Sequence, residues 1–300
     1  MRNTRSLLYY PKELARRILP PELLSKRYFR QHLGYSLHLR NPQSFNEKLQ
    51  WLKLYYYPQS PLAVQCTDKY EVRRYLSEIG LGDCLNTLYG VWDKAEDIDW
   101  NDLPEQFAMK CTHGCEFNIM CKSKATLDTT AAVRQLNAWL RIKFGYFLAE
   151  PHYNKIKPRI IAEKYLGENI VNYKFFCFHG EPLFMYVVQG SGKEKRLTCY
   201  DINQRELPYK QHFRPVIETP ETRDKFDEMV RISKSLSHPF PFVRVDLYKI
   251  DGKILLGEMT FTPSAGFESF YPKEYDQKLG AHIHLEYPPE VPELLHFSQI

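Results

Sequence analysis

The stretch VRVDLYKIDGKILLGEMTFTP, residues 243–263, decides how this chain is interpreted. Two runs of alternating residues flank Asp251 and Gly252, a pair typical of tight turns, so the stretch predicts a β-hairpin. The two runs are otherwise apolar, yet they carry Arg244, Asp246 and Glu258. Buried charges are costly unless each has a partner, so these side chains require a specific explanation.

The relative placement of the two carboxylates depends on the turn. Side chains two apart in a strand share a face, so Arg244 lies with Asp246, and Glu258 lies with Thr260. A two-residue loop would pair Asp246 with Gly257 and send Glu258 to the opposite face. A three-residue loop, usually with a glycine bulge, places both carboxylates on one face, so a functional hairpin requires this longer loop or a bulge elsewhere. Oxygen ligands held in this way suit Mg²⁺, and an exposed Arg–Asp–Glu salt-bridge ladder is the alternative.

The composition is typical of a folded, soluble protein. The 300 residues are 43% hydrophobic, and 41 basic residues stand against 36 acidic ones, which excludes a disordered chain. The net charge of +5 permits anionic ligands but indicates no nucleic-acid partner. Seven cysteines without the spacing of a disulfide framework favour reduced thiols and a cytoplasmic location. No stretch approaches the roughly 20 apolar residues that span a bilayer.

Residues 5–19 combine basic side chains with leucine and isoleucine. This pattern predicts either peripheral contact with the inner face of a membrane or a helix whose apolar side docks on the rest of the protein. No secretion signal is visible, because only four apolar residues precede Pro11.

Three regions differ in their pattern. Residues 1–100 are predicted to be mostly helical, with breaks at prolines. Residues 101–166 combine short apolar runs with one helix-spaced segment, which predicts a small central subdomain of strands and a helix. Residues 167–300 are richer in strands. Because strands and helices mix without a regular βαβ alternation, the sequence predicts an α+β fold.

Three lysines stand at unusual positions. Lys69 lies in the first turn of a helix predicted from residue 68, where a cation opposes the helix dipole but stands beside N–H groups that bind anions. Lys110 ends an apolar strand before a loop that contains Gly114, and Lys174 opens another apolar strand. Together with Arg244 these lysines supply four positive charges suited to a triphosphate. Each one alone also fits a solvated lysine.

Glu163 interrupts the apolar run IIAEKYL, residues 160–166. An acid within such a strand is uncommon, and the peptide groups that follow it offer N–H and C=O to a planar base such as adenine. An edge strand with Glu163 and Lys164 pointing outward on opposite faces is the alternative.

Taken in order, these segments resemble the TupA-like ATP-grasp family, which is associated with polysaccharide biosynthesis. The resemblance extends from about residue 30 to about residue 280. It is carried by SFNEKLQWLKLY at 44–55, TDKYEVRRYL at 67–76, LYGVWD at 88–93, MKCTHG at 109–114, NYKFFCFHGEP at 172–182 and the hairpin. The ordered set is specific, whereas GEMTFTP alone is not.

The resemblance implies an ATP-grasp fold with a helical N-terminal region, a central lid subdomain over 101–166 and a C-terminal subdomain over 167–300. It also implies a role for each candidate residue, and two roles for Lys174. The ATP contacts are Lys69, Lys110 and Lys174 at the phosphates, and Glu163 with the backbone of Lys164, Tyr165 and Leu166 at the adenine. The Mg²⁺ ligands are Asp246 and Glu258 with Thr260, and the catalytic residues are Arg244, which stabilises the transferring phosphoryl group, and Lys174.

The implied activity is that of an ATP-dependent carboxylate–amine ligase that forms an acyl phosphate. Its expected substrates are an amino acid or amine and a carboxylate-bearing saccharide, such as a uronic-acid-containing surface polysaccharide or its precursor. Such chemistry depends on positioning and charge, so it requires no nucleophilic side chain. A glycosyltransferase of the same pathway is an alternative of another class.

A third hypothesis is a non-catalytic relative that acts as a binding partner. Its basis is the loop THGCEFN at 112–118, where Cys115 and Glu116 replace the more glycine-rich version that relatives have, and Asn172 where they commonly have aspartate. Cysteine and histidine in and beside this loop also suggest zinc. The spacing of Cys111, His113, Cys115 and Cys121 matches no common structural zinc site, however.

Overall fold

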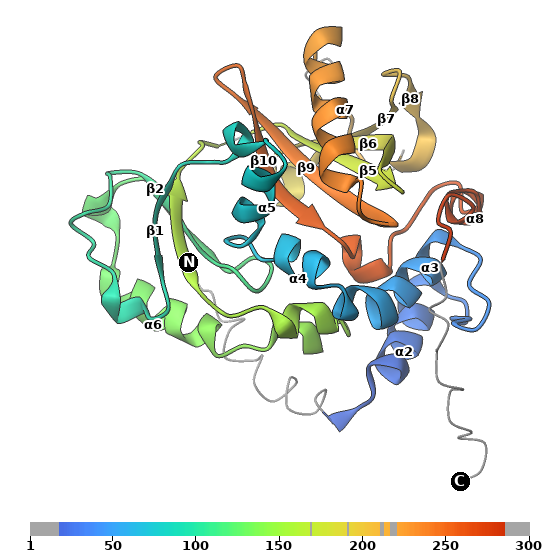
Figure 1. Cartoon of the computed structure of the whole chain (residues 1–300), viewed down its shortest axis with the longest axis horizontal. Coiled ribbons are helices and arrows are strands. Elements are labelled where there is room, and N and C mark those ends of the chain that lie inside the picture. The colour runs from blue at the N-terminus through green and yellow to red at the C-terminus, as the bar shows by residue number, and fades with distance from the viewer. Residues whose placement is uncertain (1–17, 169, 191, 211–212, 217–220, 286–300) are drawn as a thin grey trace.

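Figure 1 shows the computed structural model, which describes residues 18–168, 170–190, 192–210, 213–216 and 221–285. The described chain forms two antiparallel sheets and seven α-helices, which confirms the predicted α+β class. The helices are α2 Pro21–Leu33, α3 Phe45–Trp51, α4 Pro61–Thr67, α5 Val72–Glu78, α6 Thr129–Leu140, α7 Arg223–Ser237 and α8 Glu274–Gly280. A π-helical turn, Leu52–Tyr56, continues α3.

The smaller sheet has the strand order β1-β4-β2-β3. Its strands are β1 Leu88–Trp92, β2 Phe107–Cys111, β3 Asn118–Cys121 and β4 Ile160–Lys164. One face packs on α6 and forms a separate core that includes Phe107, Met109 and Trp139. The predicted division at residues 100 and 166 stays a proposal, and β1 shows that this sheet itself begins before residue 100.

The larger sheet has the strand order β10-β9-β5-β6-β7-β8. Its strands are β5 Asn172–Phe178, β6 Glu181–Gln189, β7 Arg196–Asp201, β8 Glu206–Leu207, β9 Phe242–Ile250 and β10 Lys253–Thr260. Helix α7 crosses one face (Figure 1), and Phe226 of this helix lies 5.9 Å from the ring of Phe175. On the other face, Phe45 of α3 packs edge-on against Phe242 at 5.0 Å. The N-terminal helices and this sheet therefore share one hydrophobic core.

The three-residue loop is absent from the hairpin, and the alternative of a bulge elsewhere in it is confirmed. Strands β9 and β10 are joined by Asp251 and Gly252 alone, and both residues have positive φ angles, 50° and 77°. Such φ values are typical of the two-residue turn whose twist matches that of the strands. The extra residue lies instead within β10, where the register shifts at Gly257 so that Glu258 pairs with Asp246. The two carboxylates consequently share a face, by a bulge in a different place.

The start of the helix near Lys69 also differs from the prediction. Helix α5 begins at Val72, and Lys69 lies in the turn that joins α4 to α5. Asp68 stabilises this turn by accepting hydrogen bonds from the backbone N–H groups of Tyr70 at 2.8 Å and Glu71 at 3.3 Å. Lys69 is therefore fixed by a turn rather than by a helix end.

Candidate functional site

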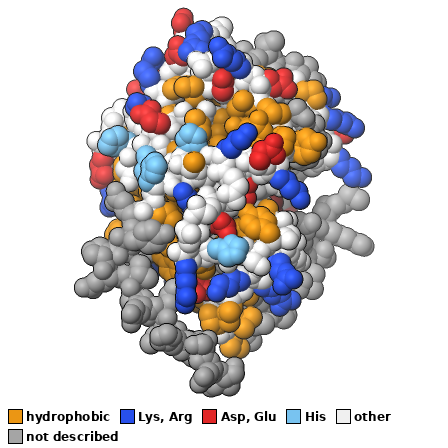
Figure 2. Space-filling view, turned by 90° about the vertical axis from the view of Figure 1, so that its right-hand side faces the viewer, with side chains coloured by type: hydrophobic (Ala, Val, Ile, Leu, Met, Phe, Trp, Pro, Cys, Tyr) orange, Lys and Arg blue, Asp and Glu red, His pale blue; other side chains and the backbone are white. Residues whose placement is uncertain are grey.

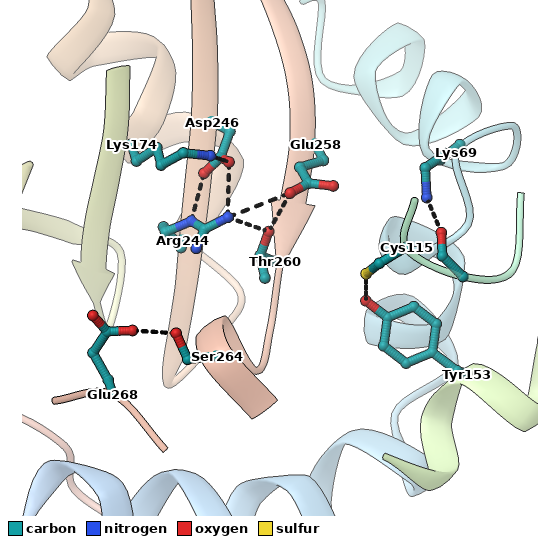
Figure 3. A network of polar contacts seen from close by, with 11 residues as sticks. Lys69, Cys115, Tyr153, Lys174, Arg244, Asp246, Glu258, Thr260, Ser264 and Glu268 are labelled. Atoms are coloured by element: carbon teal, nitrogen blue, oxygen red, sulfur yellow. Dashed lines mark hydrogen bonds and ion pairs between the residues drawn. The ribbon is translucent and has the colours of Figure 1, made fainter. Parts of the chain in front are cut away.

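The polar face of the hairpin centres on Asp246, which is fully buried. Arg244 donates to both of its oxygens, from Nε to Oδ1 at 2.6 Å and from a terminal nitrogen to Oδ2 at 2.8 Å (Figure 3). The ammonium of Lys174 on neighbouring strand β5 also donates to Oδ2. This contact follows from the register, because Lys174 and Asp246 are cross-strand partners. The sheet thus brings together three of the residues that the sequence singles out.

Glu258 and Thr260 complete this face from β10. The same terminal nitrogen of Arg244 donates to Glu258 Oε1 at 3.3 Å and to Thr260 Oγ1 at 3.0 Å. The Thr260 hydroxyl in turn donates to Glu258 Oε1 at 3.1 Å. The side chain of Arg244 is 14% exposed, whereas that of Glu258 is 39% exposed. Arg244 is therefore the buried side chain that contacts Asp246, Glu258 and Thr260, and Glu258 lies at the solvent-exposed side of the site.

The charges of this cluster hold one another in the ionised form. Burial by itself would raise the pKa of Glu258, but the positive charges of Lys174, Arg244 and Lys69 outweigh it and lower the pKa to about 2. Burial opposes the charge of Arg244 as well, yet the neighbouring carboxylates, above all Asp246, raise the pKa of its guanidinium. Glu258 and Arg244 are consequently both charged at neutral pH.

The donor set fits a magnesium ion. Mg²⁺ prefers oxygen ligands and commonly takes one or two carboxylates together with phosphate oxygens. Asp246 and Glu258 lie opposite each other on neighbouring strands, and Thr260 adds a hydroxyl on the same face. Both oxygens of Asp246 accept from Arg244 and Lys174, so a metal ion would share this carboxylate with, or take it from, those cations.

Lys69 lies across an opening from the hairpin (Figure 3). Its Nζ donates to the carbonyl of Gly114 at 2.6 Å, in the loop between β2 and β3. In the same loop the exposed thiol of Cys115 lies 3.6 Å from the hydroxyl of Tyr153. Lys69 therefore ties the turn before α5 to the loop that follows the predicted phosphate contact Lys110.

A pocket lies where three parts of the chain meet. Its lining includes Lys69 from the turn before α5, Lys110 and Glu163 from the small sheet, and Gly257 and Glu258 from β10. Four of these five residues are the predicted ATP and metal residues. The fold thus assembles four candidates around one cavity, whereas the candidates Lys164, Tyr165, Leu166 and Lys174 do not line it.

Within this pocket Lys110 is paired with Glu163, and the nitrogen–oxygen distance is 2.8 Å. The strand of Glu163 is interior to the sheet, because β4 pairs with both β1 and β2, so the edge-strand alternative is wrong. The backbone of Lys164 is engaged: its N–H donates to Thr87 O at 2.9 Å, and its carbonyl accepts from Asn86 Nδ2 at 2.9 Å. Tyr165 and Leu166 lie beyond the end of β4, and the contact of Lys164, Tyr165 and Leu166 with a base stays a prediction.

Sequence reasoning missed two residues of the pocket. Arg73 on α5 lies 3.3 Å from Glu163 Oε1 and donates to the carbonyl of Asn86 at 2.9 Å. Asn86 in turn holds the carbonyl of Lys164. Arg73 falls within the motif TDKYEVRRYL, but an arginine in an amphipathic helix is usually a solvated residue. Its role becomes visible only once α5 and β4 are adjacent.

The zinc hypothesis finds no support in the described part of the chain. Among those residues no group of three or more His, Cys, Asp or Glu side chains is placed to hold a metal ion. Cys111 and Cys121 lie buried in strands of the small sheet. Burial lowers the pKa of His113 to about 4, and its Nε2 lies 3.1 Å from the carbonyl of Trp139. These side chains contribute to packing around the loop.

Comparison with known proteins places the chain among ATP-grasp proteins. A family model described as TupA-like ATPgrasp matches residues 47–284. Solved structures with a similar fold include D-alanine–D-alanine ligase from Bacillus anthracis complexed with ATP, at 15% identity and a TM-score of 0.47, covering 85% of this chain and 71% of that chain. L-amino acid ligase from Bacillus licheniformis matches at 12% identity and a TM-score of 0.45, covering 74% and 48%. No curated protein matches the chain.

Proposed function

Because the chain belongs to the TupA-like ATP-grasp family, we propose that it is an ATP-dependent ligase that joins a carboxylate to an amine. The observation that carries this proposal is the cluster of Arg244, Asp246 and Glu258 beside the pocket that Glu258 shares with Lys69 and Lys110. The cluster combines oxygen ligands for a metal with cations for a polyphosphate. It holds no activated nucleophilic side chain, and phosphoryl transfer needs none.

In the proposed reaction a carboxylate oxygen of the acceptor attacks the γ-phosphorus of ATP, and ADP leaves. The amine nitrogen then attacks the acyl carbon, phosphate leaves, and the nitrogen loses a proton. Bound at Asp246, Glu258 and Thr260, Mg²⁺ would neutralise charge on the triphosphate.

The chain's own cations have separate tasks in this scheme. Lys69, Lys110 and Lys174 bind phosphate oxygens, and Glu163, the partner of Lys110, contacts the nucleoside. Arg244, between Asp246 and Thr260, donates to the oxygens on which charge develops, first on the phosphoryl group and then on the acyl carbon. Positioning and charge neutralisation thereby account for the catalysis.

The substrates follow from the family rather than from the pocket. We infer an amino acid or amine as nucleophile and a uronic-acid-containing surface polysaccharide or its precursor as acceptor, in the cytoplasm. Within the described residues no helix is long and apolar enough to cross a bilayer. The predicted membrane contact over residues 5–19 lies mostly outside the described residues, and its last two positions, Ile18 and Leu19, are exposed.

The test is thermal unfolding with and without Mg·ATP, followed by assays of ADP and phosphate release. A ligand selective for the folded state raises the melting temperature, so wild-type protein is expected to gain stability only when both Mg²⁺ and ATP are present. Product release should require both an amine and a carboxylate acceptor.

Asp246→Asn and Glu258→Gln are expected to abolish turnover, and Glu78→Gln, an exposed glutamate of α5, is the matched control. Unchanged turnover in the first two variants would contradict the metal assignment. Preference for a nucleotide-sugar, with sugar transfer, would select the glycosyltransferase. Absence of Mg·ATP binding to wild-type protein would select the non-catalytic relative.

A further inference from the structure

A strained turn follows the hairpin. In the turn Pro263–Gly266, Ser264 and Ala265 have φ angles of 51° and 54°, and Gly266 has a φ of 76°. Non-glycine residues rarely adopt this left-handed conformation, and two in succession are rarer still. Such a turn persists only where surrounding contacts hold it, and strain of this kind concentrates at functional sites.

The contacts that hold the turn come from helix α3 and the π-helical turn after it. Gln50 donates from Nε2 to the carbonyls of Ala265 at 3.0 Å and Gly266 at 2.8 Å. Lys53 donates from Nζ to the same Ala265 carbonyl and to the carbonyl of Leu148, each at 2.9 Å. Gln50 and Lys53 are both fully buried.

Asn46 extends this series by one helical turn. Its Nδ2 donates to the carbonyl of Glu268 at 2.8 Å, and its Oδ1 accepts from the N–H of Glu268 at 2.7 Å. Residues 46, 50 and 53 follow helical spacing, so they lie on one face of the helix. We name Asn46, Gln50 and Lys53 the α3 stripe. The stripe bonds the main chain of the turn and of Glu268, two residues after it.

Burying the ammonium group of Lys53 costs free energy, because the charge loses its hydration. Burial lowers the pKa of Lys53 to about 7, although the carboxylate of Glu150 acts against this shift. Its Nζ also lies 4.7 Å from the ring centroid of Phe267. A methionine would pack a similar volume without desolvating a charge, so the N–H groups of Lys53 are what this position requires.

In Figure 3 Ser264 of the turn and Glu268 lie below Arg244, whereas Lys69 lies to the right, beyond Glu258. There the hydroxyl of Ser264 donates to Glu268 Oε2 at 2.5 Å, and the charge of Glu268 is one of those that raise the pKa of Arg244. Lys69 and Glu258 line the nucleotide pocket, and no residue of the turn does. The turn therefore borders Arg244 outside the nucleotide pocket, and this is the approach that we assign to the second substrate.

We propose that Asn46, Gln50 and Lys53 are positioning residues that fix the turn Pro263–Gly266 as the acceptor side of the site. The three residues act through the main chain of the turn rather than by touching a reactant. The assignment of the acceptor side rests on the proposed ligase function. The role of the α3 stripe in holding the turn is independent of that function.

The experiment compares Lys53→Met and Gln50→Met with Lys48→Met. Lys48 is the matched control, because it is a lysine of α3 that also donates to two carbonyls, those of Gly280 and Ile283, each at 2.8 Å. Hydrogen–deuterium exchange is measured for peptides covering 262–268 and 278–284. We expect faster exchange at 262–268 in the first two variants and at 278–284 in the control.

Steady-state kinetics then locate the effect. Lys53→Met and Gln50→Met are expected to raise KM for the acceptor or lower kcat severalfold while Mg·ATP binds as in wild type, and Lys48→Met should leave both parameters unchanged. Wild-type exchange at 262–268 in Gln50→Met, the milder variant, would overturn the holding role. Faster exchange with unchanged acceptor kinetics would overturn the acceptor-side assignment. Wild-type protein without Mg·ATP binding would refute the proposed function, and the exchange result would still decide the holding role.

Discussion

Gly257 determines where the second carboxylate points. It is the bulged residue of β10, and the register on its two sides differs by one residue, which brings Glu258 opposite Asp246. The ring of Tyr248 lies over it, so a Cβ at this position would stand 2.6 Å from Tyr248 Cε2. No side chain fits there without moving the ring. The site thus depends on a residue that has no functional group.

Gly257→Ala is therefore expected to weaken the site without removing any ligand. The new methyl group must displace Tyr248 or the bulge, and either movement shifts Glu258 away from Asp246. We expect a smaller gain of melting temperature on addition of Mg·ATP. Gly82→Ala is the control, because a Cβ at Gly82 meets nothing within 4 Å. Equal responses of the two variants would show that the bulge is not needed for binding.

The lowered pKa of Glu258 leads to a prediction about stability in acid. Its pKa in the folded protein is about 2, below the ordinary value of 4.5, because neighbouring cations outweigh burial. A carboxyl group with a lowered pKa contributes stability above its ordinary pKa and loses it as the pH falls through the folded value. The free energy of unfolding of the wild type should fall more steeply than that of Glu258→Gln between pH 4.5 and about 2.

The measurement is the urea midpoint as a function of pH. Glu78→Gln controls for the loss of one negative charge, because Glu78 lies exposed on α5. Parallel curves for wild type and Glu258→Gln would mean that Lys174, Arg244 and Lys69 do not hold Glu258 ionised.

At the scale of elements, the hairpin depends on its two-residue turn. Asp251 and Gly252 both have positive φ angles, and only glycine adopts this conformation without cost. Gly252→Ala should therefore lower the free energy of unfolding by ~1 kcal/mol, measured by urea denaturation. The turn lies several residues from Glu258, so the response to Mg·ATP should be retained. A variant that loses this response would indicate that the turn also sets the register of the site.

The strands of the hairpin could be predicted from the sequence, but the bulge could not. Alternation around Asp251 and Gly252 gives both strands and the shared face of Arg244 and Asp246. A bulge, however, leaves no periodic signal in a run such as LLGEM, because glycine fits either register. The requirement that the two carboxylates share a face favoured a three-residue loop, whereas the protein combines a two-residue loop with a bulge in β10.

The roles of Arg73 and of the α3 stripe could not be predicted either, because they depend on contacts between segments distant in the sequence. Arg73 reaches Glu163 across 90 residues of sequence, and Gln50 reaches Ala265 across 215. The motif SFNEKLQWLKLY contains the α3 stripe as polar residues at helical spacing among apolar ones. Such a stripe on its own predicts a solvated face, and only the packing of α3 against the turn after β10 shows that it is buried.

At the scale of the whole molecule, charge is unevenly distributed. The first 30 residues hold eight basic and two acidic side chains, a net charge of +6, so the other 270 residues carry −1. On the upper part of the face in Figure 2, basic and acidic side chains are interspersed. Ile18, before α2, and Leu23, in the first turn of α2, are 80% and 55% exposed. Basic residues and these exposed apolar residues are thus close together in the sequence.

This combination predicts binding to an anionic membrane surface, where apolar side chains enter the interface and basic ones attract lipid headgroups. The full chain should sediment with vesicles that contain phosphatidylglycerol and not with phosphatidylcholine alone, and added salt should weaken binding. Ile18→Ser with Leu23→Ser should reduce partitioning about tenfold, because two apolar side chains leave the interface. Met120→Ser, at a position 47% exposed on β3, is the control. Equal binding of both variants would assign the exposed residues of α2 to a protein contact instead.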